Sequence, residues 1–147
     1  MRSQNGFTLL ELITVLAIIG IITAIALPQY RNYVIRGKIP EATSTLSDMR
    51  VKMEQFYQDN RTYVGACAAG TVAPLPSGMK YFTFSCGGLS TTAYTITATG
   101  GVAGGDQSMT GFTYTINETN TRATTAAPTG WGPVNASCWV PGRNGSC

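Results

Sequence analysis

A chain of 147 residues has room for one compact domain and one additional segment. Its 10 Lys and Arg residues against 7 Asp and Glu residues give a formal net charge of +3, which neither predicts nor excludes nucleic-acid binding. The sequence contains no His, which argues against a His-ligated metal site and against a His general base. The acidic residues form no pair suited to acid–base chemistry. The sequence therefore predicts neither an enzyme nor a metal or cofactor site.

The chain opens with a polar stretch, residues 1–6, followed by an apolar run at residues 7–27 whose single charge is Glu11. A helix of 21 residues is about 32 Å long, enough to cross a hydrocarbon core of about 30 Å. A cleaved secretory signal is an alternative, because Ala24-Ile25-Ala26 offers small residues for cleavage. The apolar run is, however, longer than the usual length of about 7–15 residues for such signals.

An ordinary membrane anchor is the second alternative, and Glu11 argues against it. A carboxylate inside an apolar segment is costly in hydrocarbon and needs a partner. Cutting the chain after Gly6 would make Phe7 the new N-terminus, with an α-ammonium four residues before Glu11. An acid at this position suits a subunit that has to meet the N-terminus of another subunit.

The sequence GFTLLE at residues 6–11 resembles the prepilin-peptidase and methylation motif of type IV pilins. The resemblance implies that prepilin peptidase cleaves between Gly6 and Phe7 and that the Phe7 amine is methylated. It also implies an assembly contact in which Glu11 recruits the Phe7 amine of a neighbouring subunit. Gly6 and Phe7 are thus the expected processing residues, and Phe7 and Glu11 are expected assembly residues.

Two further assembly residues follow from the same resemblance. Gly20 and Pro28 lie where the pilin family has a helix-softening Gly and a kinking Pro. The pseudopilins of type II secretion systems share the motif, so a secretion pseudopilin stays open as an alternative.

A second helical pattern follows the apolar run. Between residues 35 and 56, apolar side chains recur at spacings of four and three residues, which places them on one helix face. This stripe consists of Ile35, Ile39, Ala42, Leu46, Met49, Met53 and Phe56. The opposite face, expected to be solvated, carries Glu41, Ser44, Ser47, Asp48, Arg50, Lys52 and Glu54. We expect one helix from about Phe7 to Asp59, bent at Pro28 and again at Gly37 and Pro40.

The remainder of the chain is rich in Gly, Thr, Ala and Ser, and its pattern is that of β-structure. Residues 64–79 read as a loop because they contain several Gly and Pro residues. Segments with alternating apolar and Thr residues then predict strands at Lys80–Ser85, Ala93–Thr99, Gly111–Asn117 and, more weakly, Thr121–Thr125. One apolar face and one Thr-rich face describe an antiparallel sheet covered on one side by the helical stripe.

The four Cys residues predict two disulfides in a chain that carries an export signal. Four cysteines allow three pairings, so the sequence does not decide between them. We favour Cys67–Cys86 and Cys138–Cys147 because these pairs join neighbouring segments. Each bridge should add about 2–4 kcal/mol to the stability of a small domain.

The part of the chain after the apolar run, including residues 54–63 and 138–147, resembles minor pilins and DNA-uptake pilins of Gram-negative bacteria. The resemblance implies a subunit of a surface filament that serves adhesion, twitching motility or DNA uptake, with other pilin subunits as partners. A DNA-binding pilin of a competence pilus is an alternative within this class. Lys80, Arg122 and Arg143 could share a face near the tail, residues 130–147, and contact DNA phosphates. The alternative is that they are solvated surface residues.

These inferences combine into an α+β chain with a pilin fold, in which a long N-terminal helix packs on a four-stranded antiparallel sheet. The expected parts are a leader at residues 1–6, a membrane-spanning or fibre-core half of the helix at residues 7–28, and a periplasmic head at residues 29–147. Before assembly the chain would cross the inner membrane once, and after assembly it would belong to an extracellular filament.

Overall fold

The computed structural model describes residues 6–143 and 145–147, so the predicted leader, apart from Gly6, lies outside the described residues. The elements are α1 (Leu9–Asn60), β1 (Phe82–Gly87), β2 (Thr95–Gly100), β3 (Thr113–Asn117) and β4 (Arg122–Ala126). The chain divides into two compact units, Met1–Val34 and Ile35–Cys147, which we call the stalk and the head. The predicted limits of the leader, the membrane-spanning half and the periplasmic head stay predictions.

Helix α1 is one continuous element, as the sequence predicted, and it begins two residues later than expected. Its first residue is Leu9 because Thr8 caps the helix: the Thr8 carbonyl accepts the first helical hydrogen bond, from Leu12 N–H, at 3.2 Å. The helix continues without a break through Pro28, Gly37 and Pro40. The predicted bends at these positions stay a prediction.

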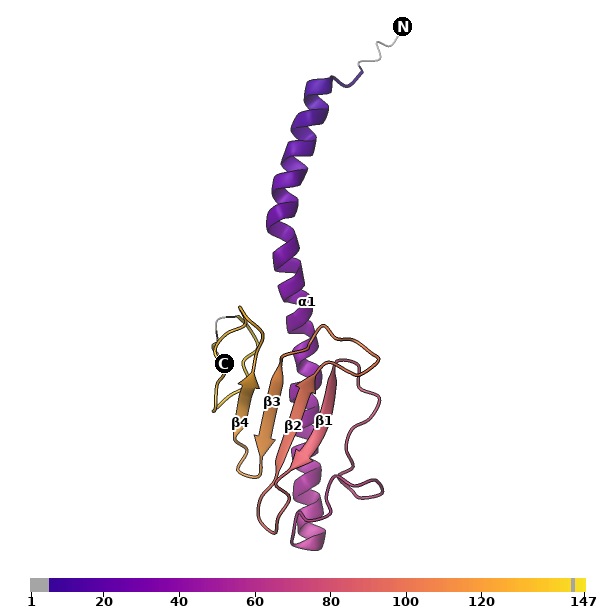
Figure 1. Ribbon diagram of the computed structural model, residues 1–147, viewed down its shortest axis with the longest axis vertical. Coiled ribbons are helices and arrows are strands. Elements are labelled where there is room, and N and C mark those ends of the chain that lie inside the picture. Colours follow the sequence, from indigo (N-terminus) through magenta and orange to yellow (C-terminus); the bar gives the residue numbers. More distant parts are fainter. Residues whose placement is uncertain (1–5, 144) are drawn as a thin grey trace. The chain divides into compact units, whose positions relative to one another are not determined.

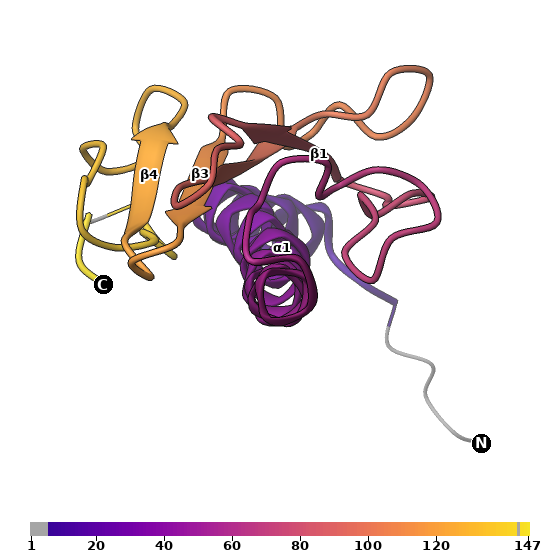
Figure 2. The ribbon, with the colours of Figure 1, turned by 90° about the horizontal axis from the view of Figure 1, so that it is seen from below.

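Within the head, the last part of α1 covers one face of the sheet and leaves the other face open (Figures 1 and 2). The predicted apolar stripe is confirmed as the helical side of the core, since six of its seven members are buried and Ile35 packs against them. The sheet and the residues directly before β2 and β3 contribute aromatic and aliphatic side chains, chiefly Phe82, Tyr94, Ile96, Phe112, Tyr114 and Ile116. A single core therefore joins helix and sheet in the head.

The sheet is an antiparallel meander in the order β1-β2-β3-β4, which confirms the predicted architecture. Strands β2 and β3 alternate buried residues with partly or fully exposed Thr residues. Cross-strand pairs Thr83–Thr99 and Thr99–Thr113 continue this pattern over three strands. The open face of the sheet is thus lined by small hydroxyl side chains, as the alternation predicted.

The first strand begins at Phe82, two residues after the predicted start at Lys80. At this start the Glu41 carboxylate accepts hydrogen bonds from the backbone N–H groups of Lys80, Tyr81 and Phe82 at 3.2, 2.7 and 3.0 Å. The first two of these N–H groups therefore bind a side chain of α1 at the place where strand pairing was expected.

This contact also corrects the expectation that Glu41 belongs to a solvated face. On that face Ser44, Asp48 and Lys52 are exposed as expected, whereas Glu41 is partly buried against the start of β1. The remaining members are also partly buried: Ser47, Arg50 and Glu54. A carboxylate satisfied by three N–H donors is stable at such a place, because buried or half-buried charge requires hydrogen-bond partners. Periodicity alone does not distinguish this environment from solvent.

The structure pairs Cys67 with Cys86 and Cys138 with Cys147, which is the pairing favoured from the sequence. The first bridge ties the loop after α1 to β1. The second closes the tail, which is also bound to the sheet: Thr124 Oγ1 donates to Cys138 O and accepts from Val140 N–H, at 3.0 and 2.8 Å. The irregular C-terminal segment is thereby held against β4 despite lacking secondary structure of its own.

Candidate functional site

The stalk exposes apolar side chains around its whole circumference. Large aliphatic residues between Leu9 and Leu27 are 47% to 76% exposed, and Phe7 is 87% exposed. Among the described residues, α1 is the one helix that is long and apolar enough to span a membrane. Water is a poor solvent for such a surface, so lipid or other protein has to cover it.

Glu11 lies near the N-terminus of α1, within hydrogen-bond reach of Thr8. The Thr8 N–H and the Thr8 hydroxyl both donate to Glu11 Oε2 at 2.8 Å, and Glu11 N–H donates to Thr8 Oγ1 at 3.2 Å. This is a capping box, in which the first turn of the helix fixes the carboxylate beside the residue that follows Phe7. The sequence analysis missed Thr8, although a Thr three residues before a Glu at the start of an apolar run signals this arrangement.

Gly20 and Pro28 both lie inside α1, in the exposed apolar stretch. A methyl group added at Gly20 would meet no other atom within 4 Å. The space beside Gly20 is therefore open among the described residues, and the assembly roles of Gly20 and Pro28 stay predictions.

The three cations suggested for DNA do not form one cluster. Arg122 begins β4, whereas Lys80 lies just before β1 at the opposite edge of the sheet, about three strand spacings of 4.8 Å away. They also lie toward opposite ends of the sheet. Phe82, near Lys80, pairs with Gly100 at the end of β2, whereas Arg122 pairs with Ile116 near the end of β3, which runs antiparallel to β2. The expectation that Lys80 shares a face with the tail is therefore wrong.

Arg122 and Arg143 do lie with the tail, and each is placed over a Trp ring. The Arg122 guanidinium is 4.9 Å from the centre of the Trp139 ring, and the Arg143 guanidinium is 5.9 Å from that of Trp131. Trp139 is itself fixed by a 2.8 Å hydrogen bond from its Nε1–H to Thr115 O. Stacking on a fixed ring orients a guanidinium while leaving its N–H groups free for an anion. The sequence offered no periodic signal for these two pairs.

Lys80 has a different environment at the far edge of the sheet. Its ammonium lies 5.1 Å from the centre of the Tyr81 ring, and Lys38 lies 4.6 Å from the same ring. Lys38 is neutralised by Asp106 in an ion pair of 2.9 Å, which attaches the loop between β2 and β3 to α1. A hydrogen bond to the Tyr81 side chain, together with its electrostatic attraction, raises the pKa of Lys80, so this side chain stays charged.

Comparison with known proteins identifies the family to which this chain belongs. The model described as "Type IV minor pilin ComP, DNA uptake sequence receptor" matches residues 28–111, more than half of the chain. The chain belongs to this family of type IV minor pilins. The model described as "Prokaryotic N-terminal methylation motif" matches residues 1–27, which confirms the resemblance seen at GFTLLE. The family consists of structural pilin subunits.

Similar proteins and structures agree with this family. The pilin is 39% identical to the fimbrial protein EcpC of Eikenella corrodens over 110 residues, which are 73% of this chain and 71% of EcpC. It is 45% identical over 67 residues to the type IV major fimbrial protein FimA of Dichelobacter nodosus, spanning 46% of this chain and less than half of FimA (42%).

A solved structure confirms the fold. The non-core minor pilin PilV of Neisseria meningitidis superposes with a TM-score of 0.51 at 17% identity, covering 67% of this chain and 93% of that one. At this identity the likeness concerns the fold alone, and it confirms the predicted pilin architecture of a long helix on a four-stranded antiparallel sheet.

Proposed function

We propose that this pilin subunit is cut between Gly6 and Phe7, methylated on the Phe7 amine and polymerised through its stalk. The observation that carries the proposal is the apolar surface of α1, exposed on every side between Leu9 and Leu27. Such a surface needs lipid before assembly and neighbouring stalks afterwards. The match of residues 1–27 to the methylation motif supports the processing step.

Glu11 is the residue proposed to select the incoming subunit. Its carboxylate is already held near the N-terminal end of the helix by Thr8, at 2.8 Å from both Thr8 donors. After cleavage, the α-ammonium of a neighbouring Phe7 would meet a fixed negative charge in a medium of low dielectric, where opposite charges attract strongly. Gly20 and Pro28 would adapt the helix to its neighbours in the fibre.

The proposed location follows from the same surface. The stalk would cross the inner membrane once, with prepilin peptidase acting on the leader and with the head in the periplasm. The two disulfides support a head that matures in an oxidising compartment. The finished subunit would then leave the membrane for the filament, as a structural rather than catalytic component.

Mass spectrometry of sheared filaments tests the processing step, because it should find Phe7 at the N-terminus with one added methyl group. An N-terminus at Leu27 would instead show cleavage after Ala24-Ile25-Ala26. Assembly is tested with Glu11→Gln, which keeps the size of the side chain and removes its charge. The variant should enter membranes as well as the wild type and be depleted from filaments, and an unchanged ratio of filament to membrane protein would contradict the proposed role.

A second proposed function is DNA binding by the head. The family model names ComP as a DNA uptake sequence receptor, and this chain presents Arg122 and Arg143 on Trp rings beside the tail. Contacts from such groups to DNA phosphates are sensitive to salt, because each contact releases a condensed counterion. The match to a minor pilin family favours a pilus over a secretion pseudopilin.

The DNA-binding proposal predicts that Arg122→Gln and Arg143→Gln weaken binding of a duplex oligonucleotide and reduce its dependence on salt. Lys80→Gln is a matched control for charge at the opposite edge of the sheet. Equal losses in all three variants would show that binding follows total charge and has no defined site at the tail.

A further inference from the structure

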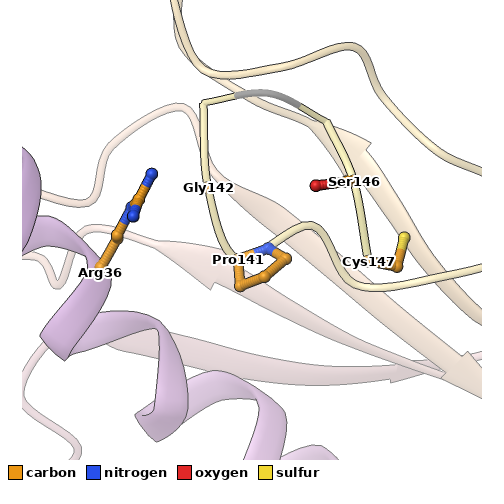
Figure 3. Close-up of a pocket in the computed structure, with 5 residues that line it drawn as sticks. All are labelled: Arg36, Pro141, Gly142, Ser146 and Cys147. Carbon is orange, nitrogen blue, oxygen red and sulfur yellow. The ribbon is translucent and has the colours of Figure 1, made fainter.

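A hollow of about 370 Å³ lies in the head between α1 and the tail. Its lining consists of Arg36 from α1 and of Pro141, Gly142, Ser146 and Cys147 from the tail. Figure 3 shows the Arg36 side chain extending from the helix on one side of the hollow, with the Ser146 hydroxyl pointing toward it from the other side. Two hydrogen-bond donors from distant parts of the sequence therefore converge on one space.

Arg36 takes part in no ion pair within the described ranges. In this part of the chain the one ion pair joins Lys38 to Asp106, and the lining of the hollow contains no acidic side chain. The next acid along α1, Glu41, binds the backbone at the start of β1. The guanidinium of Arg36 is exposed and free to bind an anion that enters the hollow.

The tail that lines the hollow also contributes Trp131, Trp139 and Arg143 to the Arg–Trp pairs. Gly142 of its lining directly precedes Arg143, whose carbonyl accepts a hydrogen bond from Gly132 N–H at 3.0 Å. The Cys138–Cys147 bridge closes this part of the tail into a loop. The wall opposite Arg36 is thus a tethered loop, which limits the entropy lost when an anion binds.

We propose that this hollow binds a phosphate group of the DNA backbone, with Arg36 donating from α1 and Ser146 donating from the tail. The inference rests on the proposed DNA-binding function and adds a helical residue to it. A guanidinium matches two phosphate oxygens in a bidentate arrangement, and a hydroxyl can donate to a third oxygen. A space of 370 Å³ is large compared with the roughly 30 Å³ of one liquid water, so it admits a phosphate with part of its hydration. Such a contact positions the duplex and reads no base.

The test uses the full chain purified in a nonionic detergent and a labelled duplex of arbitrary sequence. Affinity is measured by fluorescence anisotropy between about 50 and 200 mM salt. Arg36→Gln should remove one phosphate contact, so the negative slope of log affinity against log salt should become less steep by about 0.9. Over this fourfold change in salt, the wild type should lose about 3.5-fold more affinity than Arg36→Gln. The difference should be the same for unrelated duplex sequences.

Arg61→Gln is the matched control, since it removes the same charge just after the C-terminal end of α1, about 37 Å along the helix axis from Arg36. Its salt slope should equal that of the wild type. Ser146→Asp is a second variant that places a carboxylate opposite Arg36 at an exposed position. It should weaken binding in the wild-type background and have little further effect beside Arg36→Gln. Circular dichroism establishes that each variant keeps the fold.

The outcomes separate this inference from the function on which it rests. If the wild type binds DNA and Arg36→Gln keeps the wild-type slope, the hollow is not a phosphate site and the DNA-binding proposal stands. If the wild type binds no DNA at any salt concentration, both proposals are overturned. If Arg36→Gln leaves DNA binding unchanged but loses binding to phosphatidylglycerol vesicles, the hollow serves a lipid headgroup and the inference is also overturned.

Discussion

Replacing Glu41 by Gln should destabilise the head far more than its helical position suggests. The carboxylate accepts three backbone hydrogen bonds, at 3.2, 2.7 and 3.0 Å, from Lys80, Tyr81 and Phe82. Hydrogen bonds to a charged group contribute about 1.5–3 kcal/mol each and neutral ones about 0.5–1.5 kcal/mol. The amide keeps one acceptor oxygen and turns an NH₂ group toward a backbone donor. We expect a loss of about 3 kcal/mol, from one lost and two weakened bonds.

Thermal unfolding of residues 31–147, followed by circular dichroism, measures this effect. For a domain of this size 1 kcal/mol corresponds to about 4 °C, so the melting temperature of Glu41→Gln should fall by about 12 °C. Asp48→Asn is the matched control, because it makes the same chemical change at an exposed position of the same helix. Amide exchange at Lys80, Tyr81 and Phe82 should also accelerate. A Glu41→Gln variant as stable as Asp48→Asn would refute the proposed contact between Glu41 and the start of β1.

Three further predictions concern the head. A fragment of residues 31–147 should fold without its stalk. Reduction of Cys67–Cys86 and Cys138–Cys147 should lower its melting temperature, since each bridge contributes about 2–4 kcal/mol to stability. A melting temperature that does not change with reductant would show that the bridges do not form. Hydrogen bonds from Ser108 and Lys38 hold the pKa of Asp106 well below its ordinary range, so an NMR titration should find this carboxyl ionised below pH 3.8. The contribution of ionised Asp106 to the stability of the head should be lost only as the pH falls further. Burial and the nearby Glu54 carboxylate raise the pKa of Tyr63 to about 12. The contribution of Tyr63 to the stability of the head should therefore be complete below pH 10 and lost as the pH rises through 12. Ultraviolet titration measures the pKa, with Glu54→Gln as the comparison.

The sequence was sufficient for those parts of the fold that depend on periodic burial. The stripe on α1 and the alternation on β2 and β3 indicate which side chains leave water, and the removal of apolar surface from water is the main force that drives folding. The predicted start of β1 was two residues too early, at a place where the N–H groups of Lys80 and Tyr81 bind the Glu41 side chain, 39 and 40 residues earlier in the chain. A contact of that kind leaves no local pattern.

The candidate sites divide in the same way. Gly6, Phe7 and Glu11 lie within six consecutive residues, so a local motif was enough to predict their processing and assembly roles, which stay predictions. Lys80 was grouped wrongly with Arg122, because spacing along the chain does not tell which strand lies at which edge of a sheet. The Arg–Trp pairs and the hollow at Arg36 arise where the irregular tail folds back, and only the tertiary structure brings those residues together.

The charged side chains of the head differ in whether another group of the chain binds them. Four acids have their own internal partners: Glu41 binds β1, Asp106 binds Lys38, Glu54 accepts from the Tyr63 hydroxyl and Glu118 accepts from Tyr94 N–H. The arginines beside the tail, Arg36, Arg122 and Arg143, have no such acid among the described residues. These three arginines are therefore available to an external anion, which the proposed binding of DNA requires. Under that proposal a few such contacts would hold the DNA, and the binding would weaken as the salt concentration rises.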